Sequence, residues 1–221
     1  MRFRPVQSSI APVVTLFCLL AAQGCVAAGG GPTGKADNEY GQFRIKRTPA
    51  QLMAESTMQN FADLVDANDE ITWQVYVPKS YDPDKPAGLL VYISPGPFGD
   101  MPSGWKPIFE DENLIWISAD RSGNRARTKE RMLFATLAPY VVSERYAIDP
   151  ERIYLSGFSG GGKTASIGAT QFAKLFTGAL CICGVEFGSG LSPSLLSQVQ
   201  SNRYEFATGG RDFNRLLTGN I

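Results

Sequence analysis

Residues 153–164 read IYLSGFSGGGKT, and this stretch constrains the fold more than any other part of the chain. It begins with an apolar run, which is typical of a strand covered on both faces of a sheet. Four of the six residues 157–162 are glycine. Glycine allows a tight turn, and a helix is predicted over 163–176. A strand joined closely to a helix is the repeating unit of an α/β fold.

The same alternation runs along the rest of the chain. Helical apolar spacing also covers 51–65, and Pro139 predicts a kink or an early end in a helix over 127–146. Because strands and helices alternate, we predict a three-layer α/β/α sandwich with a mostly parallel sheet. The predicted strands are 71–77, 88–94, 113–119, 152–156, 179–183 and 204–208, and a further helix includes 195–199.

The first residues of the chain indicate export. Arg2 and Arg4 precede an apolar run at 10–22, IAPVVTLFCLLAA. This run has the length of a signal-peptide core and is short for a membrane span. The folded domain is therefore expected outside the cytoplasm, in the periplasm, on the cell envelope or secreted.

Two cleavage sites compete behind this run. Residues 22–25 (AQGC) resemble a lipobox, so that 1–24 would be removed and Cys25 would carry a lipid anchor. Residues 26–28 (VAA) suit an ordinary signal peptidase instead. We expect 25–41 to be a flexible linker, because its glycine-rich polar composition cannot form a core. The globular domain is assigned to 42–221.

Two motifs overlap in the glycine-rich stretch. Residues 157–161 (GFSGG) fit G-x-S-x-G, a turn that presents a nucleophilic serine at the end of a strand. Residues 157–164 (GFSGGGKT) fit G-x-x-x-x-G-K-[ST], the P-loop that binds nucleotide phosphates. Both motifs lie between a strand and a helix, so the local pattern does not choose between them.

Chain position and compartment favour the serine turn. A P-loop usually follows the first strand of its domain, whereas several strands precede residue 157. Asp120 ends a strand as a magnesium-binding aspartate would, but it lies before the loop. An exported protein also meets little ATP. Lys163 is then an ordinary helix residue near the surface.

The serine turn assigns a role to each residue around it. Ser159 is the candidate nucleophile, and Gly157 and Gly161 flank the turn, where Cβ atoms would collide. The N–H of Gly160, at the start of the helix, would point towards a developing oxyanion. A second donor is expected from the loop at 94–99 (SPGPFG). The prolines there lack an N–H, which leaves Gly96, Phe98 and Gly99.

Three stretches resemble the α/β-hydrolase superfamily, most closely its secreted esterases and polyhydroxybutyrate-depolymerase-like enzymes. They are VYVPKSYDPDKPAGLLVYIS at 75–94, YAIDPERIYLSGFSGGGKTAS at 146–166 and FATGGRDFNR at 206–215. The resemblance covers about residues 70–215. It implies a carboxylic ester hydrolase that forms an acyl-enzyme on Ser159, with Asp212 as the acid that follows a later strand. An aspartate there could instead serve as a turn or cap residue.

The composition departs from that family in one respect, since the chain contains no histidine. The family uses histidine as the base that activates serine. We expect that the sequence is truncated before its last strand and helix, with a histidine within about 40 to 60 further residues. The alternative is a non-catalytic, hydrolase-like envelope lipoprotein. As given, the chain should be nearly inactive and poorly stable, with an open sheet edge.

Composition and cysteine usage add few constraints. The net charge is zero, so no nucleic-acid partner is indicated. An ester or acyl compound is the expected partner, and a membrane only through the N-terminal lipid. No cofactor or metal is implied. Cys181 and Cys183 are expected to be buried thiols on one strand, too poorly placed to bridge each other. A P-loop nucleotide binder is the third alternative for function.

Overall fold

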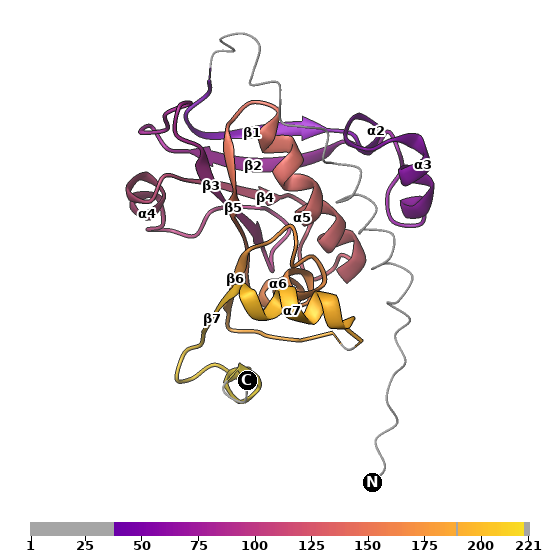
Figure 1. The fold of residues 1–221 in the computed structure, drawn as a ribbon, viewed down its shortest axis with the longest axis vertical. Helices are drawn as coiled ribbons and strands as arrows, with labels where there is room; N and C mark the ends of the chain where they lie inside the picture. Colours follow the sequence, from indigo (N-terminus) through magenta and orange to yellow (C-terminus); the bar gives the residue numbers. More distant parts are fainter. Residues whose placement is uncertain (1–37, 189, 219–221) are drawn as a thin grey trace.

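A single seven-stranded sheet organises the molecule (Figure 1), as seen in a computed structural model that describes residues 38–188 and 190–218. Strands β3 to β7 are mutually parallel, while β2 pairs antiparallel with β1 and β4. The strands, in their order across the sheet, are β1 (Gly41–Arg47), β2 (Ile71–Val77), β4 (Leu114–Ala119), β3 (Ala87–Ile93), β5 (Ile148–Phe158), β6 (Gly178–Ile182) and β7 (Arg203–Ala207).

Helices cover both faces of this sheet, which confirms the predicted mostly parallel three-layer arrangement. In Figure 1, α4 lies on one side of the strands and α5, α6 and α7 lie on the other. No helix of the described residues is long and apolar enough to cross a membrane. The helices are α2 (Pro49–Leu52), α3 (Glu55–Met58), the 3₁₀ turn η1 (Gln59–Phe61), α4 (Lys106–Asp111), α5 (Thr128–Ser143), α6 (Gly160–Gln171), α7 (Pro193–Ser201) and α8 (Arg215–Thr218).

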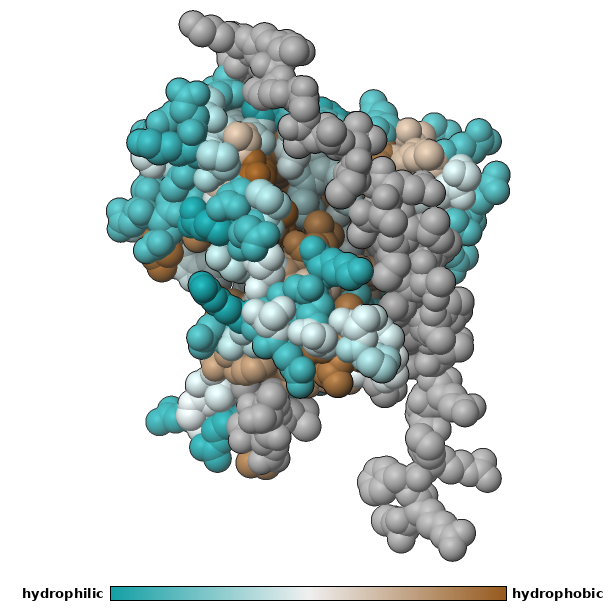
Figure 2. Space-filling model, viewed as in Figure 1, coloured by the Kyte–Doolittle hydropathy of each residue, from teal (hydrophilic) through white to brown (hydrophobic). Residues whose placement is uncertain are grey.

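The core is divided by the sheet because successive side chains of a strand point to opposite faces. In β3, Leu89, Val91 and Ile93 belong to the large cluster that packs under α5 and α6. Leu90 and Tyr92 face the other way, into a smaller aromatic cluster under α4. Both sets are buried, so β3 is covered on each face, as its continuous apolar run predicted. The face of the molecule shown in Figure 2 is mostly hydrophilic, with small apolar patches.

Some predicted elements were wrong. The helix predicted over 51–65 is three short pieces, α2, α3 and η1. Strand β1 was not predicted at all; alternate polar side chains on it face solvent, so its pattern is weak. Helix α5 does not end at Pro139 but continues to Ser143. Pro139 has no N–H, so one backbone hydrogen bond of the helix is lost, at a cost of about 3 kcal/mol. Burial of eleven of the sixteen residues of α5 offsets this cost.

The two cysteines also differ from the prediction. Cys181 is fully buried in β6, and burial raises the pKa of its thiol to about 12. Cys183 is only half-buried and lies beyond the end of β6, with φ 55°. They do not share one strand face, because the backbone leaves the extended conformation between them. The predicted signal peptide, Cys25 and most of the predicted linker lie outside the described residues.

Candidate active site

Ser159 occupies a strained turn at the centre of the sheet. It is the single residue between the end of β5 at Phe158 and the start of α6 at Gly160. Its backbone has φ 54° and ψ −119°, a conformation that side-chain-bearing residues rarely adopt. The turn is held by its N–H, which donates to the carbonyl of Ile182 at 2.7 Å. Because β5 lies between β3 and β6, Ser159 emerges where loops of three strands meet.

The glycines around Ser159 are explained by backbone crowding. A Cβ on Gly157 would lie 2.4 Å from the carbonyl carbon of Gly161. A Cβ on Gly161 would lie 1.9 Å from the carbonyl oxygen of Ile93, the last residue of β3. No Cβ makes contacts this close, so the strand, the turn and the helix fit together only with glycine at both positions. This is the packing that the G-x-S-x-G interpretation required.

The same segment does not form a P-loop. A P-loop needs several residues between strand and helix to wrap their N–H groups around phosphate. Here only Ser159 lies between them. The hydroxyl of Thr164 donates to the carbonyl of Gly160 at 3.1 Å, within the helix, and the N–H of Lys163 donates to Ser159 at 3.1 Å. Lys163 and Thr164 of that motif are thus ordinary residues near the start of α6.

The loop at 94–99 offers one free donor among the three predicted. The N–H of Gly96 donates to the hydroxyl of Ser94 at 3.1 Å, and that of Gly99 donates to Asp120 at 2.8 Å. Within the described residues, no acceptor is recorded for the N–H of Phe98. For Gly160, the first residue of α6, the described residues likewise provide no recorded acceptor for the N–H, as expected of a first helical residue. Gly160 and Phe98 are therefore the donors available for an oxyanion.

Arg131 ties the surrounding loops together and was missed by the sequence analysis. Only 4% of its surface is exposed, and its guanidinium donates to the carbonyls of Ser94 (3.2 Å), Ser122 (2.8 Å) and Gly160 (3.1 Å). Burial lowers the pKa of Arg131 to about 10. The sequence does contain a signal for this role, because Arg131 directly precedes the apolar residues of α5. An arginine buried at such a position needs hydrogen-bond partners for its charge.

Asp212 lies in the loop after β7, on the same edge of the sheet as Ser159, because β5, β6 and β7 are parallel. Its carboxylate accepts hydrogen bonds from the N–H of Asn214 (3.0 Å) and the hydroxyl of Thr208 (2.9 Å). The bond from Asn214 is the main cause that lowers the pKa of Asp212. The side chain of Asn214 also donates to the carbonyl of Cys183 at 2.8 Å, which fixes this loop against the end of β6.

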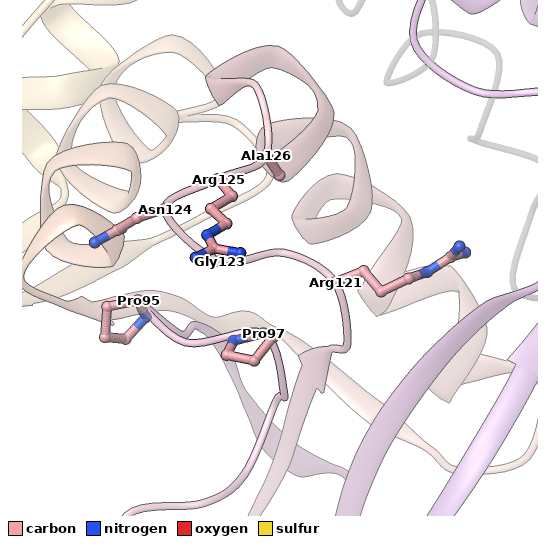
Figure 3. Close-up of a pocket in the computed structure, with 7 residues that line it drawn as sticks. All are labelled: Pro95, Pro97, Arg121, Gly123, Asn124, Arg125 and Ala126. Atoms are coloured by element: carbon pink, nitrogen blue, oxygen red, sulfur yellow. The ribbon is translucent and has the colours of Figure 1, made fainter.

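A cavity of about 590 Å³ opens beside the turn (Figure 3). Pro95 and Pro97 form one wall, and the loop at 121–126 forms the other. The two loops are joined by backbone hydrogen bonds from Arg121 to Pro97 (2.6 Å) and from Asn124 to Pro95 (3.0 Å). Asn124 also reaches the turn, since a Cβ on Gly160 would lie 2.2 Å from its Oδ1. The described residues hold no cluster of three potential metal ligands.

Comparisons with known proteins identify the fold. No protein-family model matches the chain, and no curated protein matches its sequence. Solved structures do match. The feruloyl esterase module from Clostridium thermocellum superposes with a TM-score of 0.55 at 15% identity, over 81% of this chain and 71% of that one. LpqC, a poly(3-hydroxybutyrate) depolymerase from Bordetella parapertussis, superposes with a TM-score of 0.53 at 16% identity, over 81% of this chain and 69% of that one.

The chain therefore has the α/β-hydrolase fold, as the resemblance of its three stretches implied. The match to a thermostable esterase, at 18% identity and a TM-score of 0.46, covers 65% of this chain and 52% of that enzyme, so the chain spans about half of its length. The strand order and the parallel sheet place Ser159, the 94–99 loop and Asp212 on one edge. That edge is where open α/β sheets bind their ligands.

Proposed function

We propose that this protein is a serine hydrolase that cleaves carboxylic esters through an acyl-enzyme on Ser159. Fold alone does not define activity. The observation that carries the proposal is the strained backbone of Ser159, with φ 54°, directly before the unpaired N–H of Gly160. Such strain persists only where the surrounding packing enforces it, and it is concentrated at functional sites. Esterases among the structural neighbours agree with the proposal.

The chemistry would proceed in two steps. The Oγ of Ser159 attacks the ester carbonyl, and the N–H groups of Gly160 and Phe98 stabilise the oxyanion. The proton of Ser159 passes through a base to the departing alcohol, and water later releases the acid and returns a proton to the serine. Asp212, ionised and fixed by two donors, would orient the base. The family's base is a histidine, which is not among the 221 residues given.

We also propose that the enzyme works outside the cytoplasm. The arginines and apolar run before residue 23 support export, and Cys25 supports a lipid anchor. One observation favours a second candidate function: without a histidine, the scaffold would bind acyl compounds and not hydrolyse them. The two candidates share the site and differ only in turnover.

Chemical rescue separates these candidates. Imidazole added to the protein would replace the missing base, and 4-nitrophenyl acetate hydrolysis would rise by roughly tenfold or more over the Ser159→Ala variant in the same imidazole. In the same imidazole, a fluorophosphonate probe should label wild type and not Ser159→Ala. If both proteins give the same rate and neither is labelled, ester hydrolysis is rejected and the non-catalytic candidate is retained.

A further inference from the structure

The segment at 121–131 carries four arginines that differ in what they bind. Arg131 donates to three buried carbonyls, as described above. Arg121 donates to the carbonyl of Glu70 at 2.9 Å, and Arg127 donates to the carbonyl of Asp63 at 2.6 Å. Arg125 has no recorded hydrogen bond or ion pair to any described residue. Its guanidinium is therefore available to a ligand.

Arg125 also points into the cavity. Figure 3 shows its side chain directed from the 121–126 loop towards Pro95 and Pro97, whereas Arg121 points away. Among the described residues, the charged side chains that line the cavity are these two arginines, and none of the lining residues is acidic. The proline wall opposite is apolar and carries no N–H of its own. A ligand there would meet one free cation across from a hydrophobic surface.

The cavity is adjacent to the proposed oxyanion site. Asn124, the neighbour of Arg125, touches Gly160, the residue that follows the nucleophile. A Cβ on Gly123 would lie 2.3 Å from the carbonyl oxygen of Gly96, in the loop that carries Phe98. The cavity that Arg125 faces therefore lies next to the proposed oxyanion site.

From this arrangement we propose that Arg125 is a specificity-determining residue that binds a carboxylate on the substrate, several atoms from the scissile carbonyl. Arginine suits this role because its planar guanidinium can donate two parallel hydrogen bonds to a carboxylate. The substrate class is then esters that also carry a free carboxylate, such as half-esters of dicarboxylic acids. The assignment rests on the proposed function only in naming the ligand a substrate.

Equilibrium binding tests this without turnover. N-butylsuccinamate is an uncleaved half-amide with a carboxylate, and N-butylbutanamide is its neutral counterpart of the same length. Calorimetric titration of wild type should show roughly tenfold tighter binding of the anionic amide. Arg125→Gln should remove that preference. Arg121→Gln is the matched control and should keep it, since that guanidinium is engaged by Glu70.

A further variant keeps this result distinct from the outcome for hydrolysis. Ser159→Ala should retain the preference for the anionic amide, because the carboxylate contact does not use the nucleophile. If wild type prefers the anionic amide but shows no turnover that depends on Ser159, the esterase proposal is rejected and the carboxylate site at Arg125 is retained. Equal affinity of wild type for the two amides, binding of neither, or preference that survives in Arg125→Gln would overturn the role of Arg125. Circular dichroism should show unchanged folding of Arg125→Gln, since the exposed side chain has no recorded protein partner.

Discussion

At the scale of single residues, Asp212 is stabilised as an anion by hydrogen bonds and not by a neighbouring cation. The N–H of Asn214 contributes most, and the hydroxyl of Thr208 adds a second donor. Hydrogen bonds to the charged form favour it and lower the pKa. The stabilisation is therefore present above the pKa of the unfolded chain and is lost as the pH falls through the lower, folded pKa. These hydrogen bonds extend the ionised range of Asp212 to lower pH than that of an unpaired aspartate.

We predict that the carboxyl carbon of Asp212, followed by NMR, titrates below the ordinary value of 3.8. Thr208→Val should raise the midpoint, because one donor to the carboxylate is removed. Thr177→Val is the control: its hydroxyl donates to Glu151 and Ile153 at the opposite edge of the sheet, and the midpoint should not move. A midpoint at or above 3.8 in wild type would contradict the hydrogen-bonded arrangement.

Arg131 is expected to matter mainly for stability and for the geometry of the loops. Arg131→Met would remove the side-chain donor of the Ser94 and Ser122 carbonyls, while the carbonyl of Gly160 keeps the hydroxyl of Thr164. Each buried unsatisfied group costs about 1–3 kcal/mol, so we expect a loss of roughly 2–4 kcal/mol in unfolding free energy, measured with urea. Arg127→Met removes a similar chain from the surface and should cost less than about 1 kcal/mol. Equal losses in the two variants would contradict this role.

At the scale of elements, the contact between β3 and α6 decides how Ser159 is presented. Gly161 lies in the first turn of α6, where alanine would ordinarily stabilise the helix by about 1 kcal/mol. Its Cβ, however, would lie 1.9 Å from the carbonyl of Ile93. The overlap involves backbone, which cannot move aside as a side chain can, so crowding should exceed the gain in helix propensity.

Gly161→Ala should therefore destabilise the protein by about 1–3 kcal/mol, and serine labelling by the fluorophosphonate probe should slow as the turn shifts. Gly209→Ala is the matched control, because nothing lies within 4 Å of a Cβ built there. Thermal unfolding of both variants measures the difference. A Gly161→Ala variant as stable as wild type would mean that β3 and α6 are not packed as described.

At the scale of the whole molecule, the parallel strands bring distant segments to one edge. The loops after β3, β4, β5, β6 and β7 carry, in turn, Phe98, Arg125, Ser159, Cys183 and Asp212. They are brought together because parallel strands end on the same side and β3, β4 and β5 are neighbours in the sheet. The proposed nucleophile, its proposed donors and Arg125 thus lie on one edge of the sheet, near its centre.

The route of the whole protein to its compartment gives a further prediction. We expect the mature protein to begin at Cys25 with a diacylglyceryl group, or at a residue after Ala28, because arginines followed by an apolar run of this length are typical of a cleaved signal. Mass spectrometry of the purified N-terminus measures this. Cys25→Ala should abolish lipid attachment, while Cys18→Ala should leave it unchanged. A mature chain that retains Met1 would reject export by this signal.

The sequence by itself determined the elements with strong periodicity and the turn at Ser159. The apolar runs of β3, β4 and β5 and the glycines at 157 and 161 are local signals, because strand burial and turn strain depend on adjacent residues. Their chain order was enough to predict a mostly parallel sheet with Ser159 after one strand and Asp212 after a later one.

Only the tertiary structure decided which groups serve the site. Gly96, Phe98 and Gly99 were equivalent in sequence, and the contact of Gly99 with Asp120, twenty-one residues away, helps to single out Phe98. Arg131 and Arg125 both belong to one charged run, yet folding buries the first among carbonyls and leaves the second facing a cavity. Strand β1 forms although its own pattern is weak, because β2 supplies its partners. These outcomes depend on contacts between segments far apart in the chain, which no local pattern encodes.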